Sequence, residues 1–573
     1  MLWWPVFRPV LWTFGFGNGG LSRCLGFLVR ASARDLSTRI SLETILKFVT
    51  RLFIATILLA GVSHAATDWD TRGKAWWAHI QYLADDKLEG RGTGTEGFAK
   101  AAAYVTDQFQ KAGLQPAGLH GYAQPVELNV LQLDEAQSSL DFIRNGKAEP
   151  VQFGEDGFLQ TTPNAAPVEA PAVFIGYGLK IPEANYDDFA GVDLKGKIAV
   201  YVAGGPSSIP ASVKAHNQSG EERRKNVAQA GAVGTVMILN PQTQEIPWSR
   251  IAGARLSERM ELQDAAVATW PKFAMTMNPV HADKLFAGSG HAFQEITAVL
   301  GTDKTLPHFP LNITIRAKTA EKRSSTYSEN LAGVLPGSDP KLKDEYVAIS
   351  AHLDHLGIGE PVNGDKIYNG AMDDASGIAS VIEIARAMRD SDVKPRRPIL
   401  FLAVTGEEKG LLGSEYFASH PSVKGKIIAD LNMDMYLPLF PLKYLEVQGL
   451  GESSLGDDVT AVAKAAGVTV QADKQPDHVR FIRSDQYSFI KQGVPSLAFK
   501  FGWLPGTPEE KLFNDWYKER YHGVKDDLTQ TVDAAAAAQF NAILEKLALR
   551  IANAGQRPTW NSDSFFKRFA SAK

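Results

Sequence analysis

Residues 345–355 read Glu345-Tyr-Val-Ala-Ile-Ser-Ala-His352-Leu-Asp354-His355, an apolar run that ends in a His-x-Asp motif. A short apolar run of this kind predicts a buried strand. Similar runs lie at 399–404, 427–433 and 496–500, and helical patterns lie at 375–389, 410–419, 453–466, 484–492 and 534–554. This alternation predicts a three-layer α/β/α fold with a mostly parallel central sheet.

Polar residues gather at the carboxyl ends of three predicted strands, where open α/β sheets collect their ligands. They are His352 and Asp354 after the first strand, Glu407 and Glu408 after the second, and Asp434 after the third. Two further motifs, Met372-Asp373-Asp374-Ala-Ser-Gly and Tyr521-His522, add a carboxylate and an imidazole. Imidazole nitrogens and carboxylate oxygens are ligands for divalent cations such as zinc.

A two-metal hydrolase needs a carboxylate that bridges the ions, further ligands on each ion, and a free base that activates water. The sequence supplies all of these. We assign His352 and Asp434 to one ion, Glu408 and His522 to the other, and Asp373 to the position between them.

Glu407 is left as the general base, because consecutive side chains in a turn after a strand can point to different targets. Asp354 is expected to accept a hydrogen bond from the second N–H of His352 and so to orient the ring. We expect His355 to support the site rather than to bind metal. Each motif by itself would be an ordinary turn, helix cap or surface group. The metal site is therefore inferred from the occurrence of all the motifs together.

The composition is that of a soluble globular protein, with 44% apolar and 22% charged residues, a net charge of -4 and a pI near 6.3. This charge gives no reason to expect nucleic acid as a partner, and peptide substrates fit better. The single cysteine, Cys24, lies in the N-terminal segment, so disulfides and thiol catalysis are not expected.

Lys47 and Arg51 precede an apolar run at 52–62, which is followed by Ser63-His-Ala65. This pattern predicts a signal peptide cleaved after Ala65 and a periplasmic or secreted mature protein. The apolar run is too short for a transmembrane helix, which needs about 20 residues, and no stable membrane span is expected in the mature chain.

The chain is long enough for two folded units. We predict an N-terminal extension and signal peptide at 1–65, a first part of the catalytic domain at 66–125, a β-rich insert at 126–308, and the second part of the catalytic domain at 309–573. Two helices joined by a glycine loop are expected within 76–112. In the insert we expect strands at 172–176 and 197–202 and a helix at 221–230.

The motifs at 88–95, 351–357, 370–377, 405–414 and 483–489 resemble, in order, those of the M28 family of metallopeptidases, the co-catalytic zinc aminopeptidases and their relatives. The resemblance implies two zinc ions on the same five ligands, with Glu407 as base, and a cis peptide bond between Asp373 and Asp374. The insert, at 194–202 and 226–239, resembles a protease-associated (PA) domain, which in such enzymes lies over the cleft.

One position departs from the family pattern, because Phe481 stands where such enzymes often place a tyrosine that stabilises the oxyanion. Tyr487, Arg483 or the metal ions would then have to polarise the carbonyl, and the sequence does not choose among them. Asp485, in the same motif, is a further candidate for substrate binding.

These observations predict an exported aminopeptidase that hydrolyses N-terminal residues of peptides with a water bridging two zinc ions. The alternatives within the fold are a carboxypeptidase of the glutamate-releasing type and a one-zinc glutaminyl cyclase. A non-catalytic, receptor-like relative is a further alternative, but it should have lost ligands, and this chain retains all of them.

Overall fold

The computed structural model describes residues 68–263 and 270–570, and residues Trp69–Lys573 form one compact unit. The predicted signal peptide, its cleavage site after Ala65, and Cys24 lie outside the described residues. Among the helices of the described ranges, none has the length and apolar character needed to cross a membrane.

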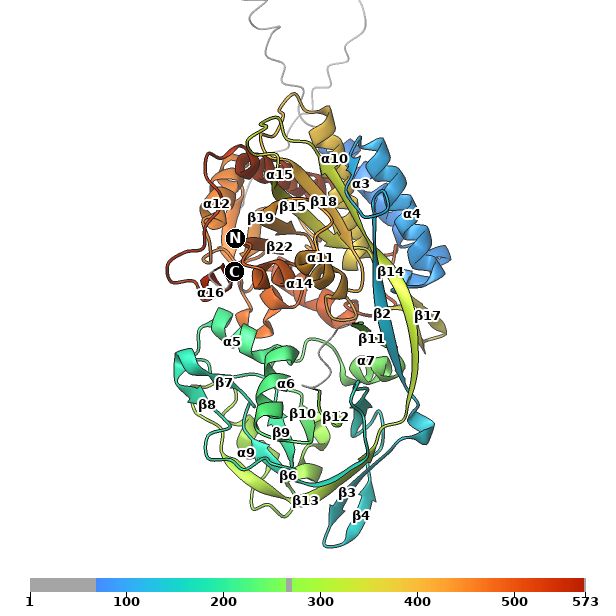
Figure 1. Cartoon of the computed structure of the whole chain (residues 1–573), viewed down its shortest axis with the longest axis vertical. Helices are drawn as coiled ribbons and strands as arrows, with labels where there is room; N and C mark the ends of the chain where they lie inside the picture. Colours follow the sequence, from blue (N-terminus) through green and yellow to red (C-terminus); the bar gives the residue numbers. More distant parts are fainter. Residues whose placement is uncertain (1–67, 264–269, 571–573) are drawn as a thin grey trace, which may run out of the picture. The chain divides into compact units, whose positions relative to one another are not determined.

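The larger of two main sheets has ten strands (Figure 1). Its centre is formed by four parallel strands in the order β18 (Ile399–Val404), β15 (Glu345–His352), β19 (Lys426–Asn432) and β22 (Ser496–Gly502). The predicted strands at 346–351, 399–404, 427–433 and 496–500 are thereby confirmed within two residues at each end.

The flanks of this sheet contain antiparallel neighbours, so the parallel arrangement is confined largely to the centre. On one side lie β14 (Glu321–Leu335), β2 (Ala123–Leu133), β11 (Arg259–Leu262) and β1 (Gln115–Pro116), and on the other β20 (Tyr444–Gln448) and β21 (Thr469–Ala472). The link at 336–344 between β14 and β15 is too short for the helical crossover that parallel strands need.

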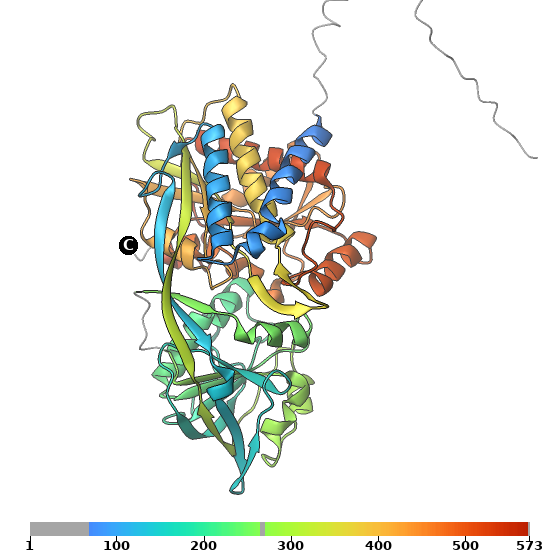
Figure 2. The same ribbon diagram turned by 90° about the vertical axis from the view of Figure 1, so that its right-hand side faces the viewer.

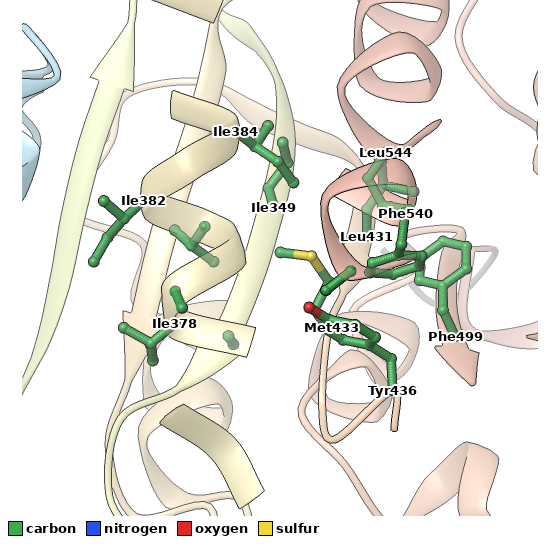
Figure 3. Packing of buried hydrophobic residues seen from close by; sticks show 14 of the residues in the cluster. Ile349, Ile378, Ile382, Ile384, Leu431, Met433, Tyr436, Phe499, Phe540 and Leu544 are labelled. Carbon is green, nitrogen blue, oxygen red and sulfur yellow. The ribbon is translucent and has the colours of Figure 1, made fainter. Parts of the chain in front are cut away.

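Helices cover both faces of the central strands. Ile349 of β15 and Leu431 of β19 face one core, which α10 (Ser376–Asp390), α15 (Ala534–Asn553), α3 (Trp69–Leu83), α4 (Glu96–Lys111) and α12 (Leu455–Ala465) complete (Figures 2 and 3). Phe540 of α15 stacks on Tyr436 in this core, with ring centroids 4.2 Å apart. On the other face α11 (Leu412–Ser419) and α13 (Gln486–Lys491) pack through Phe417 and Phe489.

The helices predicted in this part of the chain are therefore confirmed, together with the glycine loop between α3 and α4. The amphipathic helix α14 (Pro508–Glu519) was not predicted. It carries Tyr517 and leads into the turn with His522.

The second main sheet has eight strands in the order β4-β3-β13-β6-β9-β10-β12-β5. Their bounds are Lys147–Pro150 (β4), Ser139–Arg144 (β3), His308–Lys318 (β13), Val168–Ile175 (β6), Ile198–Val202 (β9), Gly234–Ile238 (β10), Phe273–Met277 (β12) and Gly157–Gln160 (β5). The four strands from β6 to β12 are parallel. This sheet has its own buried core.

The predicted insert helix at 221–230 is confirmed as α6 (Gly220–Gln229), and further short helices accompany it: α5 (Ala211–Gln218), α7 (Trp248–Gly253), α8 (Asp283–Phe286) and α9 (Phe293–Thr297). They are too short to show a clear apolar periodicity. Strands β2 and β14 pair from Ala123–Leu331 to Leu133–Glu321 and lead into and out of the second sheet. The division into domains at 126 and 308 stays a prediction, because both sheets belong to one compact unit.

A carboxylate lies buried in the centre of the larger sheet. Ser350 donates a hydrogen bond of 2.8 Å to Asp430 Oδ1, while Asp430 Oδ2 has no hydrogen-bond partner. Burial raises the pKa of Asp430 to about 8, although the hydrogen bond from Ser350 opposes the shift.

We therefore predict that Asp430 makes the protein less stable as the pH rises from about 4 to about 8. In this range the folded state keeps the proton, whereas an unfolded aspartate, with a pKa near 3.9, has lost it. Asp430→Asn removes this titration. Urea unfolding at several pH values should show the variant gaining stability over the wild type as the pH rises.

The exposed Asp457 on α12 offers a control, because Asp457→Asn should show no such trend. A stability difference between wild type and Asp430→Asn that stays constant from pH 5 to pH 8 would contradict the prediction.

Candidate metal centre

The residues predicted as ligands meet at the carboxyl edge of the parallel strands. His352 is the last residue of β15, Glu407 and Glu408 follow β18, and Asp434 follows β19. Because these strands are parallel, their carboxyl ends share one edge of the sheet. Asp373 reaches the same edge from the irregular turn before α10.

A first group consists of His352, Asp373 and Asp434, whose potential ligand atoms all lie within 4.8 Å of one another. His352 Nε2 is 3.1 Å from Asp373 Oδ1 and 3.9 Å from Asp434 Oδ1. His352 is buried, and its Nε2 has no hydrogen-bond partner.

A second group consists of His355, Asp373 and Glu408. His355 Nδ1 lies 2.7 Å from Glu408 Oε1 and 4.0 Å from Asp373 Oδ2, yet neither His355 Nδ1 nor Glu408 Oε1 has a hydrogen-bond partner. His522 Nε2 reaches the same carboxylates, 3.2 Å from Glu408 Oε2 and 3.4 Å from Asp373 Oδ2. His355, expected only to support the site, therefore lies at the second group beside His522.

Asp373 belongs to both groups and presents one carboxylate oxygen to each. Burial by itself would raise the pKa of Asp373, but the neighbouring imidazoles of His352 and His522 outweigh it and hold that pKa well below its usual range. The donor set is imidazole nitrogen and carboxylate oxygen, and buried atoms without partners point into both groups. The residues therefore fit two adjacent divalent cations that share one carboxylate.

The peptide bond between Asp373 and Asp374 is cis, as predicted. His522 adopts a left-handed backbone with φ of 52°, a conformation that a residue with a side chain rarely takes outside tight turns and functional sites.

Glu407 is partly buried and lines the adjoining cleft together with Glu408 and Asp434. Burial raises the pKa of Glu407 well above its usual value, and the Glu408 and Asp434 carboxylates add to the shift while His352 opposes it. Glu407 belongs to neither group of potential ligands. The Glu407 carboxylate therefore lies beside the two groups of potential metal ligands and is not a member of either.

Asp354 orients His352 differently from the prediction. His352 Nδ1 lies 3.0 Å from the backbone carbonyl of Asp354, whereas the nearer carboxylate oxygen is 4.0 Å away. The carboxylate instead accepts hydrogen bonds from the Thr93 hydroxyl and from the Glu407 backbone N–H.

Two further carboxylates, which the sequence did not single out, fix the loop that carries Asp373. Asp374 accepts hydrogen bonds from the backbone N–H groups of His352, Gly377 and Met435. Asp526 accepts from the backbone N–H groups of Met372 and Asp373. Asp374 is adjacent to the predicted ligand Asp373, and Asp526 comes shortly after the predicted ligand His522, and that proximity was the available signal.

Arg91, also missed, is fully buried in the glycine loop between α3 and α4. Its guanidinium donates to four backbone carbonyls, those of Leu83, Leu353, Asn369 and Gly370. Burial lowers the pKa of Arg91 to about 10, although the Asp374 carboxylate opposes the shift. Arg91 thus joins the loop after β15 to the turn before Asp373.

A cleft of about 1070 Å³ adjoins both groups. One wall comes from the catalytic part and includes Glu407, Arg483 and His522. The other comes from the predicted insert and contains residues 218–221, 223–225 and 259–262.

The three predicted substrate-binding residues have different positions. Arg483 and Tyr487 line the cleft, but the Tyr487 hydroxyl lies 2.6 Å from His216 Nδ1 of the insert. Asp485 is fully buried, does not line the cleft, and has no hydrogen-bond partner on either carboxylate oxygen. Phe481 packs in an apolar cluster with Phe566.

The fold and the imidazole–carboxylate groups define a metallohydrolase of the α/β class. The sequence model of peptidase family M28 matches residues 330–548, the segment that holds every predicted ligand. By this match, the segment resembles the M28 metallopeptidases.

Similar proteins with assigned names cover parts of the chain. A "probable leucine aminopeptidase 2" of Aspergillus oryzae is 28% identical over 232 residues, 38% of this chain and 43% of that protein. A "probable glutamate carboxypeptidase" of Zea mays is 26% identical over 380 residues, 60% of this chain and 47% of that protein. The chain thus spans less than half the length of these two relatives.

Among solved structures, the "Aminopeptidase from Aneurinibacillus sp. strain AM-1" has the same fold. The comparison gives a TM-score of 0.54 at 21% sequence identity and covers 86% of this chain and 97% of that one.

Arg91→Lys is predicted to destabilise the protein by about 3 kcal/mol, because an ammonium group cannot serve four carbonyls that a planar guanidinium serves together. The free energy of unfolding in urea measures the loss. Arg316→Lys, at an exposed position of β13, is the matched control and should change stability by less than about 0.5 kcal/mol. Equal stability of the two variants would contradict the role given to Arg91.

Proposed function

We propose that this protein is an exported zinc-dependent aminopeptidase that removes N-terminal residues from peptides. The observation that carries the proposal is the pair of metal-binding groups that share Asp373, with Glu407 beside them at the wall of the cleft. Imidazole and carboxylate ligands suit zinc.

The five predicted ligands are divided between two zinc ions. His352 and Asp434 would hold one ion, Glu408 and His522 the other, and Asp373 both. His355 is close enough to Glu408 and Asp373 to belong with the second ion as well. Zinc at these positions would polarise the scissile carbonyl and acidify water.

The chain's own residues then perform the proton transfers. Glu407 accepts the proton of the attacking water at its carboxylate and delivers it to the leaving amine. The Asp354 carbonyl keeps His352 in one orientation, and the Asp354 carboxylate keeps the turn of Glu407 in place through the Glu407 backbone N–H. These two contacts keep the Glu407 turn and the His352 ring in fixed positions relative to each other.

The insert lines one wall of the cleft, which supports peptides rather than folded proteins as substrates. We also propose that the insert is a PA domain, which its sequence resembles. Export to the periplasm or the medium is part of the same proposal and rests on the signal-like sequence at 47–65. Amino-terminal sequencing of the secreted protein should find Ala66 as its first residue.

A carboxypeptidase is the second candidate, because the relative from Zea mays carries that name. The one-zinc cyclase is less well supported, because two groups of potential ligands are present. A receptor-like protein without activity is the least supported, because every ligand residue is retained.

Glu407→Gln is predicted to keep both zinc ions and to lose a factor of about 10²–10⁴ in kcat, because the amide cannot accept the proton. Asp373→Ala should lose metal as well as activity, because Asp373 belongs to both groups. Elemental analysis of the purified variants, combined with turnover of peptide substrates, checks both statements. A Glu407→Gln enzyme with normal turnover would refute the mechanism.

We further expect about two zinc ions per chain and release of amino acids from free peptides but not from their N-acetylated forms. Chelation should abolish the release, and added zinc should restore it. Cleavage of N-acetylated peptides from the carboxyl end would instead establish the carboxypeptidase. One zinc per chain with no hydrolysis would favour the cyclase.

A further inference from the structure

A second, small cavity of about 30 Å³ lies beside the metal centre. It shares Asp434, Met435, Arg483 and Tyr521 with the cleft, so the two spaces adjoin at these residues. Its inner wall is formed by Gln448 of β20, Ala498 and Lys500 of β22, and Tyr517 of α14, together with Glu245, Arg480 and Ser484.

The position of this cavity fits the N-terminal residue of a peptide. An exopeptidase that acts at the amino end needs open space for the leaving chain and a closed space for the single residue on the other side of the scissile bond. The cleft of about 1070 Å³ offers the open space. The small cavity, reached past Asp434, offers the closed one.

The cavity walls hold polar groups that have no partner in the protein. Gln448 and Tyr517 are buried, and neither Gln448 Nε2 nor the Tyr517 hydroxyl has a hydrogen-bond partner. Buried donors without partners are rare because burial removes their water. An amide N–H and a phenol O–H that line one cavity together suit a ligand that accepts hydrogen bonds.

Cations outnumber carboxylates around the cavity. Arg480, Arg483 and Lys500 line it, and Glu245 accepts hydrogen bonds from both arginines. The only other carboxylate in its lining is that of Asp434, a member of the first metal-binding group.

Two contacts keep this cationic wall in place. Lys500 Nζ donates to the backbone carbonyls of Asp434 and Met435, at 2.7 and 3.1 Å. The Arg480 guanidinium lies over the Tyr517 ring, 4.4 Å from its centroid. Glu446, which pairs with Lys500 across β20 and β22, does not line the cavity. Burial raises the pKa of Glu446 to about 7, so at neutral pH it carries only part of a negative charge.

We propose that this cavity is the specificity pocket for the side chain of the N-terminal residue. It binds a short acidic side chain, and aspartate is the preferred residue. The inference rests on the proposed aminopeptidase function and gives it a substrate class. The volume of about 30 Å³ counts only the space open to water-sized groups, and one water needs roughly 10–15 Å³ of it, so there is room for about two such groups. A short carboxylate is of this size, whereas a leucine or aromatic side chain is larger.

The test compares kcat/KM for the p-nitroanilides of aspartate, asparagine, leucine and lysine with the zinc-loaded enzyme. We expect aspartate to exceed leucine by at least tenfold. Tyr517→Phe removes the hydroxyl and keeps the ring under Arg480, so it should lower the value for aspartate about tenfold and leave leucine unchanged. Gln448→Leu should act in the same direction. Tyr327→Phe, on an exposed part of β14, is the matched control and should change none of the four values.

Faster hydrolysis of leucine or lysine than of aspartate by the wild type would overturn the inference while leaving the aminopeptidase intact. So would an equal loss on all four substrates in Tyr517→Phe, since it would show a structural role only. Release from none of the four anilides, with cleavage of N-acetylated peptides, would overturn the proposed function and the pocket together.

Discussion

The structure depends on a concentration of buried negative charge at one edge of a sheet. Potential ligand atoms of Asp434 and of Glu408 each lie within 4.8 Å of one from Asp373, with Glu407 close by. Carboxylates taken out of water are costly unless cations or hydrogen bonds compensate them. The imidazoles of the two groups offset part of this charge, and divalent metal would offset the rest. The buried atoms without hydrogen-bond partners, among them His352 Nε2, His355 Nδ1 and Glu408 Oε1, are consistent with this need for metal ions.

Such a site needs rigid support, because a shift of one carboxylate changes the field at all the others. The support comes from the backbone as much as from side chains. Asp374 and Asp526 bind the N–H groups of the loop that carries Asp373. Arg91 binds the carbonyls of Asn369 and Gly370 just before that loop and the carbonyl of Leu353 after β15. N–H and carbonyl groups of one short segment are thereby held from two directions, and this links chain segments that are far apart in sequence.

Residues of the predicted insert contact the site as well as lining the cleft. Arg250 of α7 donates to the carbonyl of Tyr521, 2.6 Å away, and so holds the turn that presents His522. Glu245 joins the insert to Arg480 and Arg483 at the small cavity. These contacts join residues 218–262 of the cleft wall to the turn that carries His522. Changes in the insert are therefore expected to affect metal binding as well as substrate choice.

The sequence by itself determined the central parallel strands, most of the helices that cover them, and the ligand candidates, because apolar periodicity and residues at strand ends are local signals. The cis bond after Asp373 followed from the family resemblance and is present. Only the tertiary structure decided that His355 lies beside Glu408 and that the carbonyl of Asp354, rather than its carboxylate, orients His352. It also decided the support from Arg91 and the small cavity. These features join segments up to hundreds of residues apart, and no local pattern encodes where such segments meet.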